Sequence, residues 1–145
     1  MKKILVLVLS ILFSYNLHSK IKPKLVVGVV VDQMRYDYIY RFWDKFGENG
    51  FKRLINKGHF FRNCQFGYVP TYTGPGHASI FTGTTHGSCF SYDTHVPLIF
   101  WGGNIPKGRT DRKVYIRDIA PTISTILGIS YPNGCIGNPL PEITQ

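Results

Sequence analysis

Apolar runs and helix-spaced apolar positions alternate along most of this chain. Residues 25–31 (LVVGVVV) are almost all β-branched and show no polar alternation, which is typical of a strand buried on both faces of a sheet. Residues 59–66 and 96–101 (VPLIFW) have the pattern of two further strands, and residues 114–116 that of a short one. The pattern therefore predicts several strands that are separated by other elements.

The segments between these strands show helical spacing. Apolar residues recur at this spacing over residues 35–46, and a second helix is predicted from Asn49, its N-cap, to Gly58. A third helix is predicted over residues 118–127, with Asp118 as its cap. The remaining predicted elements are a turn-rich segment at 68–76, a short helix at 77–81 and a loop tail from Gly128. Strands that alternate with helices predict an α/β fold, layered, with a mainly parallel sheet and flanking helices.

The first nineteen residues have a different pattern. Lys2 and Lys3 precede an apolar run at 4–13, which is too short for a membrane-spanning helix of roughly 20 residues. A basic start followed by a short apolar run is the pattern of a secretory signal peptide, with small Ser19 as the last residue removed. An uncleaved anchor is the alternative. We expect a periplasmic or secreted protein with no stable membrane span after cleavage.

Composition and charge narrow the classes of function. Hydrophobic residues make up 43% of the 145 residues and aromatic residues 14%, so the chain can form a packed core. Lys and Arg outnumber Asp and Glu by 17 to 8, which first suggests an anionic partner. The basic residues are scattered, however, and no nucleic-acid-binding motif is present, so we expect no nucleic-acid partner. The three cysteines are too widely spaced for a zinc ribbon and allow at most one disulfide.

Three residues are candidates for chemistry because of where the predicted elements place them. Asp32 directly follows the strand at 25–31, at the carboxyl end where α/β sheets bind ligands, although it can equally cap the next helix. Thr73 precedes Pro75 at the start of a helix, whose free N–H groups favour a phosphate; a plain N-cap is the alternative. His86 lies among small residues, which suits a metal ligand, whereas a lone surface histidine is the ordinary interpretation.

Several motifs taken together are more specific than any of these residues. V-V-V-D-Q-M-R at 29–35, G-F-K-R-L at 50–54 and P-T-Y-T-G-P-G-H-A-S-I-F-T-G at 70–83 occur in this order. With the segments at 85–102 and 117–129, they closely resemble the alkaline phosphatase superfamily. The similarity is to its bacterial threonine-nucleophile members of the phosphate-irrepressible type, which are related to nucleotide pyrophosphatase/phosphodiesterases.

This resemblance implies a role for each candidate residue. Asp32 and His86 resemble zinc-binding residues, and Thr73 resembles the metal-bound nucleophile that becomes phosphorylated. Two zinc ions in the family activate the threonine and stabilise the leaving oxygen. The resemblance implies a secreted, zinc-dependent phosphomonoesterase or phosphodiesterase that acts on a small-molecule phosphate ester.

The chain departs from the family between Thr73 and His86, where only twelve residues stand in place of a long middle section. In the family this section carries four further zinc ligands and the residues that hold the substrate phosphate. A zinc site normally takes three or four protein ligands, so neither site is complete within this chain. The alternative function is therefore a catalytically inactive remnant of the family.

The string at 82–85 (TGTT) fits the family both after the nucleophile helix and before the late histidine, so an internal deletion or an assembly error would join two distant parts of the family sequence here. The organisation that we expect is a signal peptide at 1–19, the N-terminal part of a truncated alkaline-phosphatase-like core at 20–83, and the C-terminal part of the same domain at 84–145.

Overall fold

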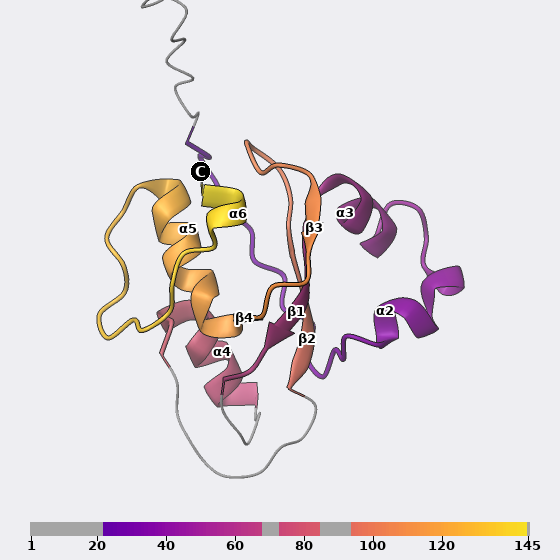
Figure 1. Ribbon diagram of the computed structural model, residues 1–145, viewed down its shortest axis with the longest axis horizontal. Helices are drawn as coiled ribbons and strands as arrows, with labels where there is room; N and C mark the ends of the chain where they lie inside the picture. Colours follow the sequence, from indigo (N-terminus) through magenta and orange to yellow (C-terminus); the bar gives the residue numbers. More distant parts are fainter. Residues whose placement is uncertain (1–21, 68–72, 85–93, 145) are drawn as a thin grey trace, which may run out of the picture.

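The computed structural model describes residues 22–67, 73–84 and 94–144 (Figure 1). Its sheet is built around β1 (His59–Gln65), which pairs antiparallel with β2 (His95–Phe100). On its other side β1 pairs in parallel with β3 (Gly108–Thr110) and β4 (Val114–Tyr115). The sheet is thus mixed, with two of its three described pairings parallel, and the predicted α/β class is confirmed.

Helices cover both faces of this sheet (Figure 1). One face carries α2 (Tyr38–Arg41), the 3-10 helix η1 (Trp43–Lys45) and α3 (Phe51–Lys57). The other carries α4 (Thr73–Thr82), the 3-10 helix η2 (Ile116–Asp118), α5 (Ile119–Leu127) and the short α6 (Pro141–Thr144). The described chain is therefore a three-layer arrangement with the sheet in the middle.

Adjacent residues of β1 supply the two cores, because successive side chains of a strand point to opposite faces. Phe60 packs with Ile39 and Ile55 beneath α2 and α3. Phe61 packs instead on the α5 and α6 side, in a cluster that also contains Cys64. A break in the β1–β2 register between Phe61 and Cys64 lets both side chains reach the same core.

The predicted helices are present with shifted ends. The helix expected over 35–46 is divided at Phe42 into α2 and η1, and α3 begins after Gly50 rather than at Asn49. The helix expected at 77–81 is longer, because α4 already begins at Thr73.

Two features at the C-terminal end were not predicted. The tail expected to be loop contains α6, and its Leu140 and Ile143 are buried in the core. Asp118 is buried, and its carboxylate accepts hydrogen bonds from the backbone N–H groups of Tyr115 (2.9 Å) and Asn138 (3.0 Å). Asp118 is the N-cap residue of α5, as the sequence predicted, but its side chain makes no cap hydrogen bond there and instead ties the tail to η2.

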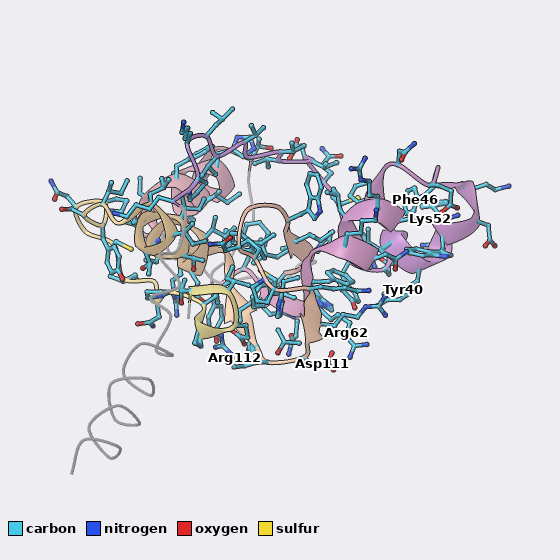
Figure 2. All side chains as sticks on the ribbon, turned by 90° about the horizontal axis from the view of Figure 1, so that it is seen from above. Tyr40, Phe46, Lys52, Arg62, Asp111 and Arg112 are labelled. Atoms are coloured by element: carbon cyan, nitrogen blue, oxygen red, sulfur yellow. The ribbon has the colours of Figure 1, made fainter. Side chains whose placement is uncertain are left out.

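The predicted strand at 25–31 is wrong. These residues lie in no strand, and their large apolar side chains are between 41% and 81% exposed. Figure 2 shows this part of the chain running along one side of the molecule. A continuous β-branched run indicates that a segment prefers to be a strand buried on both faces of a sheet. Such a strand also needs neighbouring strands to pair with, and the described sheet places no strand beside residues 25–31.

Two further expectations concern cysteines and membranes. Cys64 and Cys135 are free, and burial raises the pKa of the Cys64 thiol, which makes it inert. Cys89 lies outside the described residues. Within the described ranges, no helix has the length and apolar character needed to cross a membrane.

Candidate functional site

The first turn of α4 positions Thr73. Thr73 is the first residue of the helix and Pro75 is the third, where a missing N–H costs no intrahelical hydrogen bond. Buried Gly76 faces the ring of Phe66, and a Cβ at this glycine would lie 3.4 Å from that ring. The absence of a side chain at Gly76 therefore lets the helix start pack closely against the end of β1, while Thr73 remains exposed.

The structure brings Thr73 and Asp32 together. The Thr73 hydroxyl donates to the Asp32 carboxylate, with Oγ1 3.3 Å from Oδ1 and 3.4 Å from Oδ2. The two residues are 41 positions apart in sequence, so this contact is a product of the fold. Both side chains are exposed, and these lengths are at the long end for O–H···O hydrogen bonds. The fold thus joins two residues that the sequence singled out separately, although the strand expected to carry Asp32 is absent.

The backbone turns sharply beside Asp32. Gln33 has a φ of 57°, in the left-handed region that residues other than glycine rarely adopt. This conformation ends the extended segment and turns the chain toward α2. Left-handed residues of this kind cost roughly 1–3 kcal/mol and cluster at functional sites.

Two histidines follow the short stretch that stands in place of the family's middle section, and the structure describes only one of them. His86 lies outside the described residues. His95 begins β2, where its Nε2 lies 2.7 Å from the Arg62 carbonyl oxygen and its ring stacks on Tyr36 with centroids 4.0 Å apart. His95 therefore packs between Tyr36 and the backbone of β1.

The described residues do not complete a zinc site. No group of three or more His, Cys, Asp or Glu side chains is placed to hold a metal ion in the described part of the chain. Asp32 and Thr73 supply oxygen atoms from two residues, whereas zinc normally takes three or four protein ligands. The residues that the structure describes therefore do not fit the zinc ions that the resemblance implies.

Sequence reasoning missed a hollow on the opposite side of the sheet. It has a volume of about 410 Å³ and is lined by Ile55, Asn56, Lys107, Gly108 and Arg109. A smaller neighbouring hollow of about 200 Å³ shares Ile55 and Arg109 and has aromatic walls. Neither Asp32 nor Thr73 lines them. The sequence does show two basic residues on either side of Gly108, Lys107 and Arg109. They did not stand out because basic residues are scattered along the whole chain.

Comparison with known proteins finds similarity in the segment that contains the candidate site. Residues 26–89 match the model of the type I phosphodiesterase / nucleotide pyrophosphatase family. Alkaline phosphatase PafA of Elizabethkingia meningoseptica is 59% identical over 59 residues, and alkaline phosphatase PhoV of Synechococcus elongatus is 58% identical over the same length. This segment is alkaline-phosphatase-like. It contains Asp32, Thr73 and His86.

The alkaline-phosphatase-like match is partial. It covers 41% of this chain and 11% of each of these relatives, so the match spans about a tenth of their length. A protein of Myroides odoratus described as a calcium-transporting ATPase is 63% identical over an equally long segment. The solved structure of wild-type PafA is 60% identical over 43% of this chain and 12% of its own, with a TM-score of 0.43.

Proposed function

We propose that this chain carries the nucleophile part of an alkaline-phosphatase-type phosphoester hydrolase, with Thr73 as the nucleophile and Asp32 as a metal-binding carboxylate. The contact between Thr73 Oγ1 and the Asp32 carboxylate, at 3.3 and 3.4 Å, carries the proposal. Both residues fall inside the segment that matches the phosphodiesterase family model. The substrate class is a small phosphate ester, and zinc is the metal that the family resemblance implies.

Each residue has a part in this chemistry that its position supports. The first N–H groups of α4 have no intrahelical partner and favour the anionic oxygens of a phosphate group. Asp32 accepts the hydrogen bond of the Thr73 hydroxyl and so orients Oγ1 at the start of this helix. Exposure of both side chains leaves room for an ester to approach.

We also propose that the chain alone is not an active enzyme. This is the alternative function that the sequence predicted, a catalytically inactive remnant of the family. A helix N-terminus contributes only about 0.3–2 kcal/mol to the binding of an anion. Enzymes supply roughly 8–23 kcal/mol toward the transition state, and metal ions provide much of this in phosphoryl transfer. With the described residues unable to complete a zinc site, Thr73 stays an ordinary alcohol.

Turnover and zinc content test both parts of the proposal. We expect no hydrolysis of an aryl phosphate above the rate without protein, with or without added zinc, and less than one zinc ion per chain after dialysis. Zinc-dependent hydrolysis that Thr73→Ala abolishes would contradict the inactivity and support Thr73 as the nucleophile. Hydrolysis that Thr73→Ala leaves unchanged would contradict the assignment of Thr73.

The missing middle section is tested at the level of the gene. The loss of this section at 82–85 would also account for the uncovered segment at 25–31, because neighbours of that segment would be lost with it. Long-read sequencing across the codons for 82–86 should read through without interruption. A genome that encodes a further section at this point would show that the short chain is an artefact.

Export is the remaining part of the proposal. Lys2, Lys3 and the apolar run at 4–13 should direct secretion, with cleavage after Ser19. Mass spectrometry of the protein expressed in a bacterial host should find a mature N-terminus at or near Lys20 in the periplasmic fraction. A chain that retains Met1 in the cytosolic fraction would contradict this prediction.

A further inference from the structure

Residues 25–31 form an uncovered segment that belongs to no helix or strand. Within the described ranges, their N–H and C=O groups have no backbone hydrogen-bond partner in another element. Side chains at odd positions are the more exposed, with Val27 at 73% and Val29 at 81%, whereas Val26 and Val30 are 41% and 42% exposed. The segment thus already has the two-residue alternation of a strand. A β-branched strand with unpaired N–H and C=O groups is a template for pairing with another chain.

The sequence of this segment is nearly symmetric about Gly28. If the segment pairs antiparallel with a copy of itself, with Gly28 opposite Gly28, then valine faces valine at the neighbouring positions and Leu25 faces Val31. The same register places Lys24 opposite Asp32 on both sides of the axis. Opposite charges that face each other across an antiparallel pair stabilise it, and a shift by one residue would place both charges opposite other side chains.

The ends of the segment fit the same register. Pro23, which has no N–H to donate, falls opposite Gln33, whose left-handed backbone ends the extended conformation. The pairing is therefore limited to residues 24–32 at both ends. At its centre, a Cβ at Gly28 would meet no atom within 4 Å, so a cysteine side chain can be placed at this position without a clash.

We propose that two copies of this chain associate through residues 24–32, as an antiparallel strand pair with a two-fold axis at Gly28. The occupant of the exposed segment is a second copy because the charges and the apolar positions are complementary to themselves. The pairing brings the ammonium group of Lys24 in one copy beside the Asp32 carboxylate of the other. Each copy thus contributes a cationic group next to the other's Asp32–Thr73 pair.

Cross-linking tests the register directly. In a background with Cys89→Ser and Cys135→Ser, which leaves only buried Cys64, we expect Gly28→Cys to form a disulfide-linked dimer under mild oxidation. Opposite Cβ atoms in such a pair are about 4.5–5.5 Å apart, close to the distance a disulfide needs. Val26→Cys alone should not cross-link, because the two copies of residue 26 are about 13 Å apart. A mixture of Val26→Cys and Val30→Cys should cross-link.

Sedimentation of the purified protein tests the association itself. We expect a dimer, and Lys24→Asp should raise its dissociation constant about tenfold, because two opposite-charge pairs become like-charge pairs. Adding Asp32→Lys to this variant should restore the dimer. Circular dichroism of each variant establishes that it is folded. A monomer at every concentration, open-ended filaments, or equal cross-linking of Val26→Cys and Gly28→Cys would overturn the proposal.

Discussion

Two carboxylate–threonine arrangements in this molecule have opposite surroundings. Asp118 and Thr122 are buried between α5 and the tail, whereas Asp32 and Thr73 are exposed at the start of α4. Asp118 accepts backbone N–H groups at 2.9 and 3.0 Å, and Thr122 Oγ1 accepts the N–H of Leu140 at 3.0 Å. In the exposed pair, the Thr73 hydroxyl donates to the Asp32 carboxylate over the longer distances of 3.3 and 3.4 Å.

This difference separates structural residues from residues that remain available to a ligand. The buried carboxylate uses its oxygens to hold the tail against η2, so little capacity for a ligand is left. Among the residues that the structure describes, the exposed carboxylate accepts only the long hydrogen bond from Thr73, which a metal ion can displace at little cost. The same residue types therefore stabilise the fold at one place and are candidates for chemistry at the other.

The largest expected effect is at Asp118. We predict that Asp118→Ala lowers the free energy of unfolding by about 3 kcal/mol, because two buried backbone N–H groups lose a charged acceptor. The matched change at the exposed pair, Asp32→Ala, should alter it by less than about 0.5 kcal/mol. Urea unfolding of both variants, followed by circular dichroism, measures the difference.

Asp118→Asn is the control for Asp118→Ala. An asparagine retains one carbonyl acceptor, so this variant should fall between the wild type and Asp118→Ala. Equal stabilities of Asp118→Ala and Asp32→Ala would contradict the division into a structural and an available pair.

The sequence predicted the elements whose own run of residues carries a clear apolar pattern. Helical spacing located α5, and the apolar run at 96–101 located β2, because each buries its own side chains on an adjacent layer. The strand at 25–31 failed because pairing depends on distant segments, about which a local pattern carries no information. β3 and α6 were missed for the same reason, since short elements with Gly, Arg or Pro are fixed by tertiary contacts.

The candidate site was predicted in part. Asp32 and Thr73 were found through motifs, and the fold joins them. The argument from strand ends, which singled out Asp32, does not hold here because residues 25–31 form no strand. The roles of Asp118 and Thr122 could not be predicted, because Asn138 and Leu140 approach them from a tail with no periodic pattern.

A smaller effect is expected at the ion pair that holds α6. Arg112 (Figure 2) binds Glu142 through two hydrogen bonds of 2.7 and 2.8 Å, which hold the pKa of Glu142 below its usual value of 4.5. The pair should therefore stabilise the fold above pH 4.5 and lose this contribution as the pH falls through the lowered pKa. Because Arg112 is half exposed, we expect about 1 kcal/mol.

The variant Glu142→Gln removes this ion pair. Its control is Glu48→Gln, which removes the same charge from a largely exposed glutamate beside Lys52 and so measures the general effect of charge. At pH 7 the wild type should have a higher free energy of unfolding than Glu142→Gln. At pH 3 the two proteins should have similar free energies of unfolding. A difference that is as large at pH 3 as at pH 7 would assign the effect to packing of α6 rather than to the ion pair.

The smallest expected effect is at Thr73 and decides between its two interpretations. A threonine that caps a helix contributes about 0.5–2 kcal/mol, whereas a hydroxyl that points to an exposed carboxylate contributes little. Thr73 is the first residue of α4, and its hydroxyl donates to Asp32. We therefore expect Thr73→Val to change the unfolding free energy by less than about 0.5 kcal/mol. Thr122→Val, which removes the buried acceptor of the Leu140 N–H, should cost about 1–3 kcal/mol. If thermal or urea unfolding finds the two threonine variants equally destabilised, Thr73 is a helix cap, and its exposed hydroxyl no longer argues for a nucleophile.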